Sequence, residues 1–197
     1  MRMQCKISSI SKVDLTVRRW VWICLVGVFL PCLVHAQVRG GRLDAEREYN
    51  RAYELFIAEK YAAAQTVFGT VLEMLAEDGG VRHADAAYYY AVCASRLGRQ
   101  DAPSLLQNFA VDFPASTRYS SACYELGEYY YSRRKYAEAL PWYKQVEPRS
   151  VGIEVQSEVV FKTGYCYFSL GMYDEAFALF GRAKTQSGHY AEAAGYY

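Results

Sequence analysis

The side chains that could act as nucleophiles, bases or metal ligands are few and widely spaced. Beyond a leading apolar segment, the chain has three cysteines and two histidines, namely Cys93, Cys123, Cys166, His83 and His189. The cysteines stand 30 and 43 residues apart, which fits neither metal-ligand spacing nor a disulfide framework. A cysteine nucleophile also needs a nearby histidine and an orienting group, and the spacing suggests neither. We therefore expect buried free thiols, no catalytic site, no metal and no cofactor.

The charge balance argues against a nucleic-acid partner. Residues 1–36 hold five of the 22 basic residues and one of the 21 acidic ones. Residues 37–197 therefore hold 17 basic against 20 acidic side chains, a net charge of −3. Nucleic acids and anionic membrane surfaces attract a positive field, which this part of the chain lacks. We expect neither to bind it directly.

The leading segment has the pattern of a secretion signal. Arg18 and Arg19 precede an apolar run over residues 20–34, which is too short to span a bilayer comfortably. The residues Val, His and Ala follow, ending at Ala36, and they put small residues at the two positions that a signal peptidase recognises. We expect residues 1–36 to be a cleaved signal peptide, so that the protein is exported.

Two alternatives concern the same segment. An uncleaved anchor would tether the same domain outside the cytoplasm. Cys32 could instead become a lipidated first residue, but the Phe, Leu and Pro that precede it fit poorly, because that site normally requires a small residue just before the cysteine. Membrane contact is therefore expected only through a partner or such an anchor.

An internal repeat determines the expected fold. Segments beginning at Tyr61, Tyr136 and Tyr173 each read Tyr, two residues, Ala, three residues, aromatic. With a weaker copy, the anchor alanines are separated by 38, 37 and 37 residues, and they are Ala64, Ala102, Ala139 and Ala176. A second helical pattern precedes each anchor and contains one small residue that we expect to face it: Ala52, Ala91, Gly127 and Gly164.

These patterns resemble the tetratricopeptide repeat (TPR), Trp-x2-Leu-Gly-x2-Tyr followed by Ala-x3-Phe and Pro. The third copy carries Leu126, Gly127 and Tyr130 in the matching places, with Cys123 replacing the Trp. The period is near 37 residues instead of 34, which implies longer turns. The resemblance implies an all-α fold, a right-handed superhelix (solenoid) of antiparallel helix pairs, whose first helices line a groove that binds peptides or helices.

The repeat pattern divides the chain as follows. We expect a flexible leader over residues 37–43 and the start of an incomplete fifth repeat over residues 191–197. About four repeats lie between them, over residues 44–190: 44–79, 83–117, 120–153 and 157–190. The last segment indicates a longer array, or an end that docks on a partner or on itself. Pro103 and Pro141 should lie in the first turns of their helices, where a missing N–H costs little.

Aromatic residues recur on one face of the expected first helices, and this face is the candidate partner-binding groove. Its members are Tyr49, Tyr53, Phe56, Tyr88, Tyr124, Tyr131, Phe161, Tyr165 and Phe168. Tyr offers a large contact area with little rotamer entropy and is common at interfaces. Alternatively, the rings pack one repeat against the next. Arg96 and Lys162 are the nearest cations, too few to clamp a carboxylate as some cytosolic TPR proteins do.

Signal and repeats together are similar to the repeat proteins of bacterial envelope machines. The sequence therefore predicts a non-enzymatic scaffold in the periplasm or at the outer-membrane periphery, binding a protein or peptide partner in the cell envelope. The alternative is a glycan-binding module of the cell wall, since aromatic rings also stack on sugars, or the repeat portion of a larger envelope protein.

Overall fold

The computed structural model describes residues 42–77, 79–185 and 189–197. The expected signal peptide and most of the expected leader lie outside these residues. The chain divides into two units, Met1–Glu46 and Arg47–Tyr197. Of the first unit, only residues 42–46 are described, and they are helical. Residues 42 and 43 are thus helical, although we expected them to end a flexible leader.

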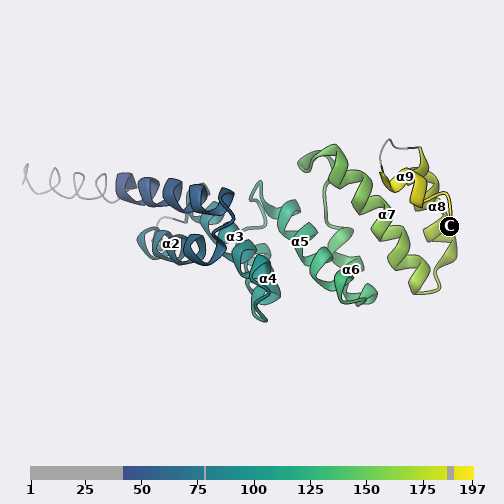
Figure 1. Ribbon diagram of the computed structural model, residues 1–197, viewed down its shortest axis with the longest axis horizontal. Helices are drawn as coiled ribbons and strands as arrows, with labels where there is room; N and C mark the ends of the chain where they lie inside the picture. The colour runs from purple at the N-terminus through teal and green to yellow at the C-terminus, as the bar shows by residue number, and fades with distance from the viewer. Residues whose placement is uncertain (1–41, 78, 186–188) are drawn as a thin grey trace, which may run out of the picture. The chain divides into compact units, whose positions relative to one another are not determined.

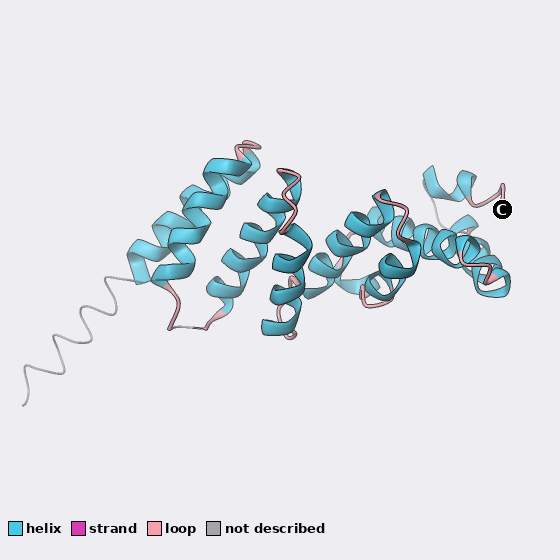
Figure 2. Ribbon diagram, turned by 90° about the horizontal axis from the view of Figure 1, so that it is seen from below, coloured by secondary structure: helices cyan, strands magenta, loops and turns pink. Residues whose placement is uncertain are grey.

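The described residues form helices and connecting turns without any strand (Figures 1 and 2). The first helix covers residues 42–57. The others are α2 (Tyr61–Met74), α3 (Val81–Arg96), α4 (Ala102–Asp112), α5 (Tyr119–Ser132), α6 (Tyr136–Tyr143), the 3-10 helix η1 (Pro148–Ser150), α7 (Ile153–Ser169), α8 (Tyr173–Lys184) and α9 (His189–Ala193). Each packs mainly against its neighbours in sequence. In the described part of the chain, no helix is long and apolar enough to cross a membrane.

The same turn closes the first helix of every pair. Its central residue has a positive φ in all four pairs, and these residues are Glu59, Gly98, Arg134 and Gly171. The next residue donates its N–H to a carbonyl five positions earlier, as in Lys135 to Tyr130 at 2.9 Å. This is the Schellman arrangement, which satisfies carbonyls left over at a helix end. It reverses the chain so that the second helix runs back along the first.

The core of each pair forms where the anchor alanine meets the first helix. The anchors Ala64, Ala102, Ala139 and Ala176 are at most 2% exposed. We expected the small residue of the first helix to face the anchor itself. At Gly127, however, the atoms nearest to an added Cβ belong to the Tyr143 ring, at 2.5 Å, four residues beyond Ala139. The glycine is therefore needed chiefly to make room for a ring.

Proline positions were predicted correctly in one helix and wrongly in another. Pro103 lies in the first turn of α4, as expected. Pro141 instead lies inside α6, near the end of this eight-residue helix. Pro cannot donate a helical hydrogen bond and crowds the preceding turn. This accounts for a second helix that is shorter in the third pair than in the others.

The close approach at Gly127 gives a stability prediction. Replacing Gly127 with Ala should destabilise the protein by about 1–3 kcal/mol, because Tyr143 is 2% exposed and its ring has little room to move. Gly181→Ala is the matched control, since a Cβ in this part of α8 meets nothing within 4 Å. It should be neutral or stabilise by up to about 1 kcal/mol. Urea unfolding followed by circular dichroism measures both, and equal effects would contradict the packing argument.

Candidate functional site

The nine aromatic residues of the expected groove all lie on first helices of the pairs, but they differ in burial. Tyr49, Tyr88 and Phe161 are buried. Each packs on an aromatic ring of the second helix in its own pair, for example Tyr88 on Phe109 at a centroid distance of 5.7 Å. These three rings therefore pack mainly within their own pair, not one repeat against the next as the alternative expected.

Four of the remaining rings lie at contacts between neighbouring pairs. Tyr53 and Phe56 pack edge-on against Tyr89 of α3, with centroids 5.3 and 5.0 Å away. Tyr131 of α5 contacts Tyr165 of α7 at 5.9 Å. The structure thus brings Tyr53 and Phe56 together at one junction and Tyr131 and Tyr165 together at another. Tyr124 instead donates a hydrogen bond to Glu158, and Phe168 contacts rings of its own pair and Tyr197. Tyr53 and Phe168 also remain 38% and 39% exposed.

Sequence reasoning missed Tyr89 and the arginines that pack on the rings. Arg82 of α3 lies over the Tyr49 ring, 4.2 Å from its centroid, and Arg118 lies 5.2 Å from the Tyr89 centroid. In each case a cation from one pair covers a ring of the preceding pair, which is a favourable cation–π geometry. Arg82 and Arg118 occupy comparable places near the starts of successive first helices, and this is the signal that could have revealed them.

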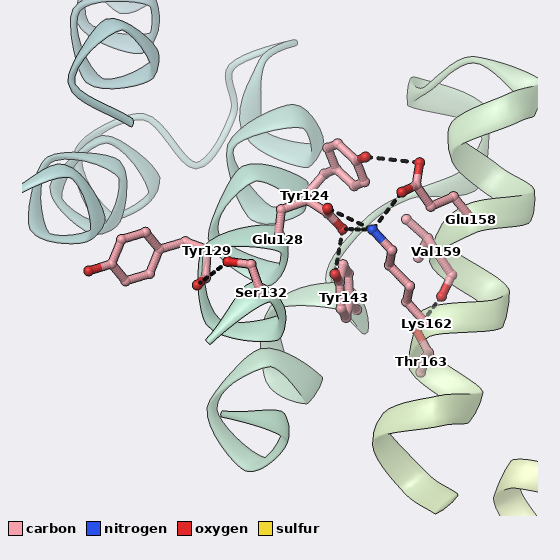
Figure 3. A network of polar contacts seen from close by, with 9 residues as sticks. All are labelled: Tyr124, Glu128, Tyr129, Ser132, Tyr143, Glu158, Val159, Lys162 and Thr163. Carbon is pink, nitrogen blue, oxygen red and sulfur yellow. Dashed lines mark hydrogen bonds and ion pairs between the residues drawn. The ribbon is translucent and has the colours of Figure 1, made fainter. Parts of the chain in front are cut away.

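A polar network joins the third and fourth pairs (Figure 3). The Lys162 ammonium group on α7 lies between two carboxylates, 2.6 Å from both oxygens of Glu128 and 2.5 Å from Glu158. Tyr124 donates a hydrogen bond to Glu158 at 3.0 Å, and Tyr143 donates one to Glu128 at 2.5 Å. Two carboxylates share one ammonium group here, so Lys162 is already engaged by anions of its own chain.

The electrostatics of the network follow from these contacts. Burial acts to lower the pKa of Lys162, but hydrogen bonds to Glu128 and Glu158 raise it overall. Burial acts to raise the pKa of Glu158, but hydrogen bonds from Lys162, Tyr190 and Tyr124 lower it overall. Both shifts favour the charged forms of Lys162 and Glu158 at neutral pH.

Arg96, the other cation near the expected groove, is also paired. Its guanidinium group lies 2.6 Å from Glu125 of the next pair. Burial raises the pKa of Glu125, and Arg96 partly opposes this shift. Both cations that the sequence offered for holding a partner's carboxylate thus bridge neighbouring pairs instead.

The candidate nucleophiles lie in the core. Cys93, Cys123 and Cys166 are buried and free. Burial raises the pKa of Cys93 and Cys166 to about 12 and that of Cys123 to about 11, so the thiols stay protonated at neutral pH. The thiolate is the reactive form of cysteine. Over the described ranges, no group of three His, Cys, Asp or Glu residues is placed to hold a metal ion.

Comparison with solved structures places the fold among TPR-like repeat proteins. BtubC (BKLC) of P. vanneervenii matches with a TM-score of 0.63 and 18% identity, over 80% of this chain and 66% of that one. MamA of AMB-1 matches with a TM-score of 0.56 and 22% identity, over 72% of each chain. A putative kinesin light chain with TPR-like repeats from Podosopora anserina matches with a TM-score of 0.55 and 16% identity, over 73% of this chain and 74% of that one. No protein-family model matches the sequence, and neither does any curated protein.

The chain is therefore an all-α protein of antiparallel helix pairs with TPR-like repeats, as the sequence predicted. Identities of this size establish the fold alone. Repeat arrays of this kind generally present extended surfaces to protein partners.

The Lys162 network predicts a pH-dependent loss of stability. Lys162→Met should cost roughly 2–4 kcal/mol at pH 7, because it leaves two partly buried carboxylates without their cation. The pKa of Glu158 in the folded state lies below 4.5. The Glu158–Lys162 pair therefore contributes fully to the stability of the fold above pH 4.5, and this contribution is lost as the pH falls through the folded-state pKa. The difference from wild type should therefore shrink in acid.

Arg51→Met is the control, since this exposed arginine pairs with Glu48 at 3.4 Å on the surface. It should change stability by less than about 0.5 kcal/mol at either pH. Thermal melts at pH 7 and pH 3 provide the measurement. Equal losses in the two variants at pH 7 would show that the network contributes no more than a surface pair.

Proposed function

We propose that this protein is a non-enzymatic scaffold of the bacterial cell envelope, which binds a protein or peptide partner on the aromatic face of its first helices. One observation carries the proposal: Tyr53 and Phe168 keep more than a third of their surface exposed while their neighbours hold them in place. Rings that are ordered and only partly buried offer apolar contact area at small entropic cost.

The chemistry of the candidate site supports binding in preference to catalysis. The thiols are buried and protonated, and both cations near the groove are paired within the chain. A partner that depends on a clamped carboxylate fits poorly with Lys162 already between two glutamates. A partner that buries apolar or aromatic side chains against Tyr53 and Phe168 fits well.

A cell-wall glycan is the second candidate ligand, because half-exposed rings also stack on sugar rings. Isolated peptidoglycan and an envelope protein extract, each offered to the immobilised protein, distinguish the two. We expect retention of a specific protein and no enrichment on peptidoglycan. Enrichment on peptidoglycan alone, lost with Tyr53→Ala, would replace the protein partner with a glycan.

Single substitutions test whether the aromatic face forms the contact. Tyr53→Ala and Phe168→Ala should each weaken partner binding about tenfold or more, and both variants should stay folded, because both side chains are partly exposed. Phe177→Ala is the matched control, since this ring is 77% exposed on α8, a second helix. It should bind normally. Unchanged affinity in both groove variants, measured by surface plasmon resonance, would contradict the assignment.

The proposed location rests on the first 36 residues. The two arginines, the short apolar run and the small residues up to Ala36 support export. When the gene is expressed in a Gram-negative bacterium, we expect the periplasmic fraction to contain a protein whose sequence begins at Gln37. Ala36→Arg should block cleavage and leave the longer form in the membrane. N-terminal sequencing checks this, and full-length protein confined to the cytoplasm would refute export.

A further inference from the structure

We propose that an aromatic site on α7 and α8 is a receptor for an aromatic side chain, and that Tyr197 of the same chain is the resident ligand. The receptor, here called the α7–α8 site, consists of Phe161, Tyr165, Phe168 and Phe180. Three of its four rings are residues of the expected groove. The inference rests on the proposed function and specifies what kind of partner segment this part of the groove takes.

Tyr197 contacts all four rings of the α7–α8 site. Its centroid lies 5.0 Å from that of Phe180, with the rings stacked at 22°. It meets Phe168 at 5.3 Å, Tyr165 at 5.7 Å and Phe161 at 6.3 Å, all edge-on at 60° or more. Stacked and edge-to-face pairs at these distances are the arrangements that the charge distribution of aromatic rings favours. The site therefore surrounds one ring with favourable partners.

Besides Tyr197 itself, Tyr190 and Ala194 hold the segment that carries Tyr197. Tyr190 packs on Phe161 at 5.4 Å and hydrogen-bonds to Glu158, and Ala194 is 5% exposed. The helix α9 (His189–Ala193), which contains Tyr190, has five residues, far fewer than a helix needs for stability of its own. Tyr197 is still 51% exposed in its site. A ligand with the same contacts could therefore replace the segment without disturbing α7 or α8.

The contacts of the resident segment define the partner. It presents an aromatic residue, a small residue four positions later and a second aromatic residue three positions after that: Tyr190, Ala194 and Tyr197. The small residue packs in the same cluster as Phe161 and Phe180. The first aromatic residue also carries a hydroxyl group that reaches Glu158 of the polar network. We assign the site to a protein segment with this pattern, which competes with residues 189–197 for the same rings.

A peptide of residues 189–197 tests the assignment on the full chain. The fluorescently labelled peptide should bind the Tyr197→Ala protein at least about tenfold more tightly than wild type, because the resident ring then no longer competes. Tyr196→Ala is the matched control, since this neighbouring ring is 90% exposed and takes no part in the four contacts. It should behave like wild type. Fluorescence anisotropy provides the measurement.

Substitutions in the receptor and in the peptide complete the test. In the Tyr197→Ala background, Phe168→Ala should abolish peptide binding and Phe177→Ala should leave it unchanged. A peptide with Tyr197→Ala should fail to bind, and one with Tyr196→Ala should bind. Equal binding to wild type and Tyr197→Ala, or no binding to a folded Tyr197→Ala protein, would overturn the proposal. So would exchange of segments between copies, seen as a wild-type dimer by light scattering that Tyr197→Ala abolishes.

A second measurement covers the case in which Tyr197→Ala fails to fold. Fluorotyrosine placed at position 197 of the otherwise wild-type chain reports on ring burial by NMR. Excess unlabelled peptide should move its signal towards that of an exposed tyrosine, and an unmoved signal would overturn the proposal. Tyr53 lies outside the α7–α8 site, so loss of partner binding by Tyr53→Ala would still support the scaffold if the peptide failed.

Discussion

The third and fourth helix pairs depend on one steric constraint, the space that the first helix leaves for a ring of the second. At Gly127 that space is filled by Tyr143, and at Gly164 by Phe180, whose ring would lie 3.1 Å from an added Cβ. In these two pairs the rings can enter because the first helix has no side chain at the glycine. This contact restricts the rotation of α5 and α7 about their own axes. It therefore determines which residues of these helices are turned away from their partner helices.

The aromatic face is a consequence of that rotation. Residues such as Tyr88 and Phe161 lie close enough to the second helix to be buried, while Tyr53 and Phe168, one or two turns further on, reach beyond it. Rings at the junctions then join successive pairs, and the Lys162 network adds a charged link between the third and fourth. The same side chains thus hold neighbouring pairs together and form the surface proposed for partner binding.

This dual use has a physical advantage for recognition. A ring that its neighbours already hold in one orientation loses little further freedom when a partner covers it. The α7–α8 site illustrates the point, because Tyr165 and Phe168 contact each other as well as Tyr197. The receptor rings are ordered by α7 and α8, while the ligand ring lies four residues beyond the end of the short helix α9. Affinity then depends on the incoming side chain more than on rearrangement of the groove.

The sequence by itself determined the helix pairs, because the regular spacing of Ala64, Ala102, Ala139 and Ala176 reports a contact that recurs once per pair. It also indicated that the cysteines would be buried and free. It could not separate Tyr88 from Phe168, since both occupy the same helical face and only the neighbouring helices decide their exposure. Nor could it pair Glu128 with Lys162, which lie 34 residues apart on different helix pairs. Those contacts were decided by the tertiary structure, because they depend on how each helix pair is set against the next.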